Sequence, residues 1–139
     1  MADILLDTGP LVALLNKDEH LHEDCVAFLE GFRGRFLSTE PVLTEGIYLL
    51  GDSFHGKKKC LEFVLEAVQL IPSSMTSLKR SLVLMEKYKD VPMDFADATL
   101  VALAEETGIG DIFTLDVKDF RTYRWLRNRT FRIYPELHC

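Results

Sequence analysis

Apolar residues recur along this chain with two different spacings, and each spacing predicts a type of element. Short apolar runs predict strands at 3–8, 34–39 and 111–116, and residues 131–135 are compatible with a last edge strand. Apolar positions three or four residues apart predict helices at 9–32 (with a break at 16–19), about 40–50, about 57–70, 76–88 and 94–107. Strands that alternate with helices at this spacing predict a parallel sheet covered on both faces.

Local signals support two of these helix boundaries. Ser38 or Thr39 is a suitable cap for the second helical region, which has Pro41 in its first turn. Gly108 follows residues 94–107 and is a suitable stop for that helix.

Composition predicts one domain, 1–139, in a reducing compartment. The length suits a single core, and 47% of the residues are apolar. Cys25, Cys60 and Cys139 are far apart and form no CxxC pair, so the sequence encodes neither a disulfide framework nor a thiolate zinc site. The first apolar run has three residues, too few for a signal peptide or a membrane span. We therefore expect a cytoplasmic protein with no membrane partner.

The net charge of −6 is unevenly distributed. Residues 118–132 contain six basic residues and one acid, a net charge of +5 that leaves −11 for the rest. Such a segment can bind nucleic acid or an acidic protein, or it can be a solvated basic surface. Tyr123, Trp125 and Phe131 lie between these arginines and are candidates either for base stacking or for packing.

Two acids end apolar strands. Asp7 follows "ILL" and Asp116 follows "IFTL". The carboxyl ends of parallel strands meet at the edge of the sheet where ligands bind. Asp is also common at the start of a loop, so either acid alone is a weak signal.

Two further acids are predicted on apolar helix faces. Glu45 has Val42, Tyr48 and Leu49 as helical neighbours, whereas Glu40 falls on the opposite side. A carboxylate on a core-facing stripe is costly unless it is paired or binds a cation. No Lys or Arg lies three or four residues from Glu45, although a distant arginine remains a possible partner.

Asp97 shows the same anomaly beside Leu100 and Val101. Asp94 lies at the edge of that stripe. A structural alternative makes Asp94 the helix cap and Asp97 a first-turn acid favoured by the helix dipole. This accounts well for Asp94 but not for the side of the helix on which Asp97 lies, so we assign Asp97 to function.

Four carboxylates from four separate elements repel one another unless a cation lies among them. Ligation by oxygen alone favours Mg²⁺ or Mn²⁺ over zinc. Such an ion activates water and neutralises phosphate oxygens, so the expected reaction is phosphodiester hydrolysis.

The motifs "LLDTGPLVALL", "PVLTEGIYLL", "MDFADATLVALAEE" and "IFTLDVKDF" occur in this order over nearly the whole chain. Together they resemble the PIN-domain nucleases, closest to the VapC-type toxins of toxin–antitoxin pairs. The resemblance implies a three-layer α/β/α domain with a central parallel sheet. It also implies a homodimer that cuts RNA and is silenced by a small VapB-like antitoxin.

Matched residue by residue, the resemblance implies that the catalytic acids, which are also the ligands of Mg²⁺ or Mn²⁺, are Asp7, Glu45, Asp97 and Asp116. Asp94, Thr8 and Thr114 match supporting positions, although each of these side chains could instead bond nearby backbone. We interpret Asp119 as a loop or helix-start acid. The basic residues expected to contact RNA are Arg121, Arg124 and Arg127.

Two other classes of protein share parts of this pattern. An aspartyl phosphatase also carries Asp after its first strand, but it needs a second Asp two positions later, where this chain has Gly9. A non-catalytic RNA- or protein-binding module on the same fold would keep the basic segment but would not need four convergent acids.

Overall fold

Five short parallel strands form the centre of the protein. The computed structural model describes residues 3–137. The strands are β1 (Ile4–Leu6), β2 (Phe36–Ser38), β3 (Val68–Leu70), β4 (Asp111–Phe113) and β5 (Arg132–Tyr134). Their order in the sheet is β3-β2-β1-β4-β5, and every neighbouring pair is parallel. The predicted parallel sheet is confirmed, and residues 131–135 do contain its edge strand.

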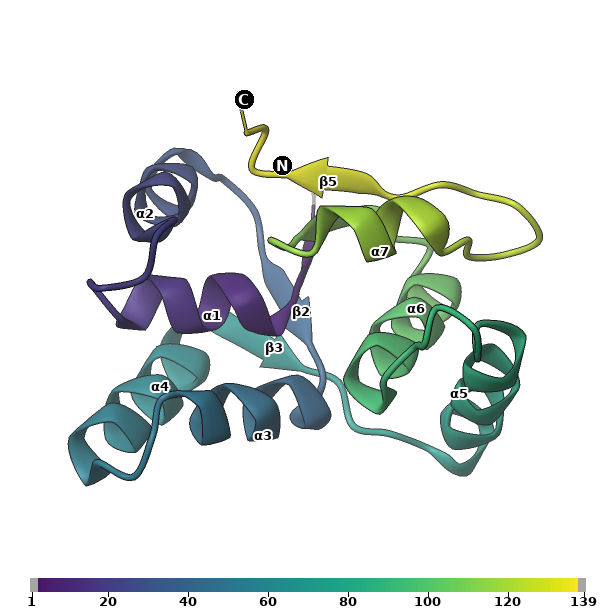
Figure 1. Cartoon of the computed structure of the whole chain (residues 1–139), viewed down its shortest axis with the longest axis horizontal. Coiled ribbons are helices and arrows are strands. Elements are labelled where there is room, and N and C mark those ends of the chain that lie inside the picture. The colour runs from purple at the N-terminus through teal and green to yellow at the C-terminus, as the bar shows by residue number, and fades with distance from the viewer. Residues whose placement is uncertain (1–2, 138–139) are drawn as a thin grey trace.

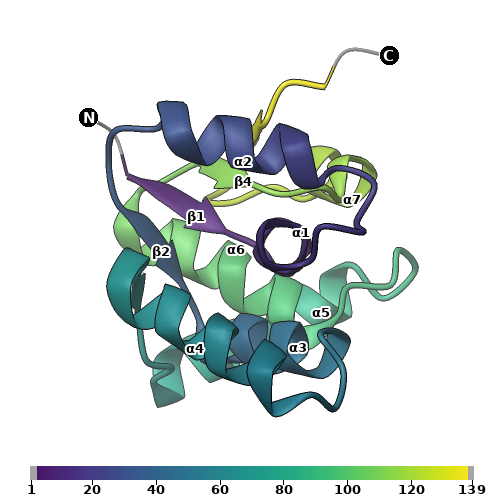
Figure 2. The ribbon, with the colours of Figure 1, turned by 90° about the vertical axis from the view of Figure 1, so that its left-hand side faces the viewer.

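Helices cover both faces of this sheet. Their bounds are α1 (Thr8–Leu15), α2 (His22–Gly31), α3 (Glu40–Leu49), α4 (Phe54–Ala67), α5 (Met75–Lys87), α6 (Phe95–Thr107) and α7 (Val117–Thr122). Figure 1 shows α1 and α2 on one side of the strands and α5 and α6 on the other. Figure 2, turned by 90°, shows α2 lying across the sheet near β4. The expected three-layer α/β/α architecture is therefore confirmed.

The core consists of the inner strands and the helix faces that pack on them. Every residue of β1 is buried, as are Ile112 and Phe113 in β4. Phe28 of α2 packs on Phe113 with ring centroids 4.6 Å apart. Residues 96–104 of α6 are all buried, so this helix lies inside the protein on almost every side. An acid in this stretch of α6 must therefore be accommodated in the interior.

Two elements differ from the sequence prediction. The helix predicted to run to Leu70 ends at Ala67, and Val68–Leu70 form strand β3 beside β2. The apolar residues at 68 and 70 continue the helical spacing, so periodicity alone could not separate a short edge strand from the helix before it. The short helix α7 was not predicted beyond the interpretation of Asp119 as a possible helix-start acid.

The strand order places a crevice between β1 and β4. Connections from β1 run through β2 to β3, and the chain then crosses back to β4 on the other side of β1. Neighbouring strands whose connections leave in opposite directions create a gap at their carboxyl ends, where α/β proteins bind ligands. Asp7 follows β1 and Asp116 comes shortly after β4, so both lie at this position.

In the described part of the chain, none of the helices has the length and apolar character needed to cross a bilayer.

Candidate active site

Asp7 lies at the floor of the site. Its side chain is 5% exposed, and its Oδ2 accepts a 2.7 Å hydrogen bond from the hydroxyl of Thr114. Burial raises the pKa of Asp7 to about 6, and the negative charges of Asp116 and Asp94 act in the same direction. The bond from Thr114 opposes this shift because it stabilises the charged carboxylate. The sequence therefore places an acid where ionisation is unfavourable without a nearby cation.

Asp97 projects from the buried side of α6. It is 7% exposed, and its Oδ2 accepts a 2.8 Å hydrogen bond from the hydroxyl of Tyr123. Burial raises the pKa of Asp97 to about 8, with further contributions from the charges of Asp7 and Asp94. The pKa of Tyr123 is also raised, because its ring is buried and its hydroxyl faces this carboxylate.

Asp94 caps α6. Its Oδ1 accepts a 2.8 Å hydrogen bond from the backbone N–H of Asp97, and its own backbone is extended. The side chain of Asp97 is bonded to Tyr123 and makes no capping bond to the described backbone. The two acids, three residues apart, thus have different contacts: Asp94 satisfies the helix end and Asp97 faces the other acids.

Asp116 and Asp119 bring two more carboxylates to the same place. Oxygens of Asp97, Asp116 and Asp119 all lie within 4.8 Å of one another. Burial and the adjacent carboxyl group of Asp119 raise the pKa of Asp116 to about 6. Asp119 lies in the first turn of α7, which turns its side chain back toward Asp116. The sequence pattern did not identify Asp119 as a site residue, although its spacing of three from Asp116 was available as a signal.

Glu45 reaches this site from α3, but not because it lies on a core-facing stripe. Tyr48 and Leu49 are 81% and 56% exposed, so the expected core-facing stripe around Glu45 is wrong. The buried positions of α3 are Val42 and Gly46. A Cβ on Gly46 would lie 2.9 Å from the Leu11 side chain, so glycine allows α3 to approach α1 closely. That approach places Glu45 beside the amino end of α1, where Asp7 lies.

The acids other than Asp119 line one cavity of about 350 Å³, and Asp119 lies next to two of them, Asp97 and Asp116. Its lining contains the four acids named from the sequence and two supporting residues: Asp7, Glu45, Asp97, Asp116, Thr8 and Asp94. The Thr114 hydroxyl, the third supporting residue, is bonded to Asp7 at one side of it and accepts a 2.9 Å hydrogen bond from the Asp116 amide.

The residues present fit a divalent metal ion. All side-chain donors around the cavity are oxygens, as Mg²⁺ and Mn²⁺ prefer. Ligand oxygens of an octahedral Mg²⁺ lie between about 2.9 Å and about 4.2 Å apart, so the oxygens of Asp97, Asp116 and Asp119, all within 4.8 Å of one another, need only small movements to share one ion. The Thr8 hydroxyl is buried and has no hydrogen-bond partner among residues 3–137, so the site contains an unused oxygen as well as unbalanced charge.

The basic segment divides into parts with different surroundings. Arg121 and Arg127 are exposed. The guanidinium of Arg124 instead donates to the carbonyl oxygens of Arg121, Thr122 and Tyr123 at 2.6, 3.2 and 3.0 Å, so it caps the end of α7. The aromatic residues Tyr123, Trp125 and Phe131 are buried, so they pack in the interior and are not available to stack on bases.

Comparisons with known proteins agree with this fold. The family model of the PIN domain matches residues 4–126, and the chain belongs to this family. Among curated proteins, none matches the chain significantly.

Solved structures similar to this fold include a VapC toxin and VapBC complexes. VapC20 of Mycobacterium tuberculosis, a sarcin-ricin loop cleaving toxin, is 19% identical with a TM-score of 0.76, over 84% of this chain and 93% of that chain. VapBC2 of Rickettsia felis, bound to promoter DNA, is 14% identical with a TM-score of 0.67, over 96% and 100%. DNA-bound VapBC of Salmonella typhimurium is 19% identical with a TM-score of 0.62, over 96% and 98%. At sequence identities of 14–19%, this similarity establishes only that the fold is shared.

Proposed function

We propose that this protein is a divalent-metal-dependent endoribonuclease that hydrolyses phosphodiester bonds in RNA. The observation that carries the proposal is that carboxylates from the end of β1, from α3, from α6 and from the β4–α7 turn line one cavity. This cavity lies at the crevice between β1 and β4, the switch point where the connections of neighbouring strands leave in opposite directions. Structural carboxylates would be expected to pair with arginine or lysine, yet within the described chain none of the ion pairs involves these acids. Their arrangement is that of a cation site.

A bound Mg²⁺ or Mn²⁺ would supply an activated water and neutralise charge on the phosphate. Asp7, Asp97 and Asp116 would hold the ion, and Asp119 joins them on the geometry described above. Glu45, which also lines the cavity, would help to hold the ion or accept a proton from the attacking water. The buried Thr8 hydroxyl has no partner among residues 3–137 and would be a further hydrogen-bond donor at this cavity.

The biological role proposed is that of the toxin in a VapBC-type pair. The structural relatives with antitoxins bound cover nearly the whole of this chain. A VapB-like antitoxin would then be the partner that blocks the acidic cavity, and the cell compartment would be the cytoplasm. RNA is the substrate class because one relative of the same fold is described as cleaving the sarcin-ricin loop.

The same proposal includes a homodimer. A groove of about 880 Å³ lies between α3 and the start of α5 and α6. Its lining includes the exposed apolar residues Tyr48, Leu78 and Phe95, which are 81%, 38% and 41% exposed. Exposed apolar groups at one groove favour burial against a second copy. Light scattering of Leu78→Glu checks this: the wild type should have the mass of a dimer and the variant that of a monomer.

Cleavage of a mixed RNA pool tests the activity. The wild type should cut RNA with Mg²⁺ or Mn²⁺ and should stop with EDTA. Glu45→Gln should lose this activity, whereas Glu40→Gln on the same helix should keep it, because Glu40 lines the apolar groove and not the acidic cavity. Undiminished cleavage in excess EDTA would contradict the proposed metal-dependent mechanism.

Binding without cleavage is the main alternative outcome. A wild-type protein that binds RNA or an antitoxin peptide but leaves RNA intact with every metal would be a non-catalytic module of the same fold. The aspartyl phosphatase alternative is disfavoured because it needs an Asp at position 9. A Cβ on residue 9 would lie 3.3 Å from the Cβ of Leu115, a close contact.

A further inference from the structure

Tyr123 is a buried aromatic residue with its hydroxyl at the acidic site. It follows α7 and is 0% exposed. Its hydroxyl donates a 2.8 Å hydrogen bond to Oδ2 of Asp97. Among residues 3–137, Oδ1 of Asp97 accepts no hydrogen bond from a side chain or from backbone. One oxygen of this carboxylate is therefore held by the protein interior, and the other is left to face the cavity.

Two aromatic rings hold the ring of Tyr123 in place. Phe120 of α7 and Tyr88 at the end of α5 each contact it edge-on, with ring centroids 5.1 Å away in both pairs. Because the ring is buried between these two neighbours, it has little freedom to rotate, and its hydroxyl stays directed at Asp97.

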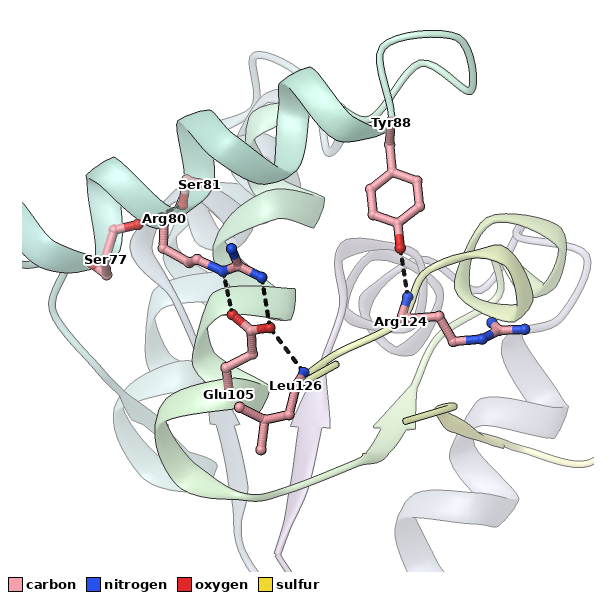
Figure 3. Close-up of polar contacts among 7 residues, drawn as sticks. All are labelled: Ser77, Arg80, Ser81, Tyr88, Glu105, Arg124 and Leu126. Atoms are coloured by element: carbon pink, nitrogen blue, oxygen red, sulfur yellow. Dashed lines mark hydrogen bonds and ion pairs between the residues drawn. The ribbon is translucent and has the colours of Figure 1, made fainter. Parts of the chain in front are cut away.

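The backbone that follows Tyr123 is anchored twice (Figure 3). The hydroxyl of Tyr88 accepts a 2.9 Å hydrogen bond from the backbone N–H of Arg124. The Glu105 carboxylate accepts a 2.9 Å bond from the N–H of Leu126, and Arg80 donates to the same carboxylate at 2.6 and 3.0 Å.

These anchors support a tight turn. Leu126 and Arg127 have φ values of 37° and 46°, in the left-handed region that side-chain-bearing residues rarely adopt. Contacts from α5 and α6 thus fix a segment that would otherwise relax, and Tyr123 lies at the start of that segment.

We propose that Tyr123 is a positioning residue for the metal site, and that its hydroxyl fixes the orientation of Asp97 so that the free oxygen points at the ion. The inference rests on the proposed function. Metal affinity depends on ligand oxygens that are already oriented, because an unrestrained carboxylate loses rotational freedom on binding. Partners that orient a metal ligand change affinity by about 10–100-fold when removed.

The test replaces Tyr123 with Phe and titrates Mn²⁺ into metal-free protein, following bound ion by electron paramagnetic resonance. The ring packing against Phe120 and Tyr88 is kept, and only the hydroxyl is removed. We expect the Kd for Mn²⁺ to rise about 10-fold or more. In RNA cleavage at a fixed, subsaturating Mn²⁺ concentration, kcat should fall while the KM for RNA stays within about twofold, since the surface that binds RNA is unchanged.

Tyr88→Phe is the matched control. It removes a hydroxyl from the neighbouring ring, one that bonds the Arg124 backbone and no acid. This variant should melt at a lower temperature without metal yet keep a Kd for Mn²⁺ near that of the wild type, because the rings around Tyr123 and the bond from Leu126 to Glu105 still hold the segment. Each titration is run well below the melting midpoint of the variant measured, so that an unstable variant still reports its affinity.

The outcomes separate the two proposals. A wild type that binds no Mn²⁺ overturns the proposed function. A wild type that binds Mn²⁺, with Tyr123→Phe binding it equally well, overturns the positioning role alone. An equal decrease of affinity in Tyr123→Phe and Tyr88→Phe also overturns it, because the effect would then not depend on the hydroxyl that bonds Asp97.

Discussion

Thr114 and Asp7 lie 107 residues apart in the chain and share a buried 2.7 Å hydrogen bond between Thr114 Oγ1 and Asp7 Oδ2. The same hydroxyl accepts a 2.9 Å bond from the backbone N–H of Asp116. One threonine on the turn after β4 therefore ties the acid that follows β1 to the acid that follows β4. This connection fixes the spacing of two proposed metal ligands across the switch point of the sheet.

Replacing Thr114 with Val should weaken both the site and the fold. The side chain keeps its shape, but Asp7 loses a donor and the Asp116 amide loses an acceptor. We expect a decrease of about 1–3 kcal/mol in the free energy of unfolding and a Kd for Mn²⁺ raised about 10-fold. Urea unfolding and a metal titration measure the two effects.

Ser38→Ala is the control for Thr114→Val. The Ser38 hydroxyl is buried and donates to the carbonyl oxygen of Leu6, and it bonds no acid. This variant should lose stability while keeping its affinity for Mn²⁺. Unchanged metal affinity in Thr114→Val would limit Thr114 to a structural role.

The stability of the metal-free protein should fall as pH rises from about 5 to about 8. Burial raises the pKa of Asp7 and of Asp116 to about 6 and that of Asp97 to about 8, from an unfolded value near 3.8. In this range the folded protein binds more protons than the unfolded chain, so raising the pH favours unfolding. Saturating Mn²⁺ should reverse the trend, because the ion competes with protons for the same carboxylates.

Melting temperatures at several pH values across this range, with and without Mn²⁺, check this expectation. Asp97→Asn should make the decline shallower over the whole range and nearly remove it between about pH 6 and pH 8, where Asp97 is the main group that still holds a proton in the folded protein and not in the unfolded chain. A metal-free melting temperature that is constant or rises over this range would contradict the assignment of unbalanced charge to the cavity.

The sequence predicted the layers, the parallel sheet and Asp7 and Asp116 at strand ends, because each depends on local spacing and on general rules of chain connection. It did not predict β3, because Val68 and Leu70 continue the apolar spacing of the helix before them. Of the two reasons for assigning Glu45 to the site, the family motif and a core-facing stripe, the structure contradicts the stripe. The position of Glu45 depends on the close packing of Gly46 against Leu11, which no pattern within α3 reveals.

Tyr123 and Asp119 illustrate a second limit. Among arginines and other aromatic residues, Tyr123 has the sequence context of a residue that stacks on bases, and only the fold shows its hydroxyl on Asp97. Asp119 joins the site because α7 starts at Val117 and turns it back toward Asp116. Contacts between elements that are distant in sequence, and a helix of six residues, both lie beyond what periodicity can detect.

The basic segment should contribute to RNA binding through its exposed arginines. Arg121→Gln with Arg127→Gln should weaken RNA binding and reduce the slope of log K against log salt concentration by about 0.7 for each phosphate that the variant no longer neutralises. Filter binding across a range of salt concentrations measures both quantities. Lys58→Gln with Lys59→Gln, which removes the same charge from α4, should leave the slope unchanged.

Arg124→Gln should differ from the other two arginine variants. Its guanidinium caps the end of α7, so its removal should lower the melting temperature more than either of the others. If the salt slope is the same in Arg121→Gln, Arg127→Gln and wild type, these arginines serve contacts with the antitoxin or a second copy.

Three variants should distinguish the role of Asp94 from that of Asp97, because Asp94 caps α6 and Asp97 faces the other acids. Asn is as good a cap as Asp, so Asp94→Asn should keep the stability of the wild type, whereas Asp94→Ala should lose about 1 kcal/mol.

Asp97→Asn keeps an acceptor for Tyr123 and removes a charge that burial and the charges of Asp7 and Asp94 disfavour. Its metal-free stability near pH 8 should therefore equal or exceed that of the wild type, while RNA cleavage and the thermal shift with Mn²⁺ should be abolished, since that shift depends on affinity for the folded state. Melting curves with and without Mn²⁺, beside an RNA-cleavage time course, decide between the two roles. An Asp97→Asn protein that melts lower without metal and still cuts RNA at the wild-type rate would make Asp97 a structural residue and leave the metal site to Asp7, Glu45, Asp116 and Asp119.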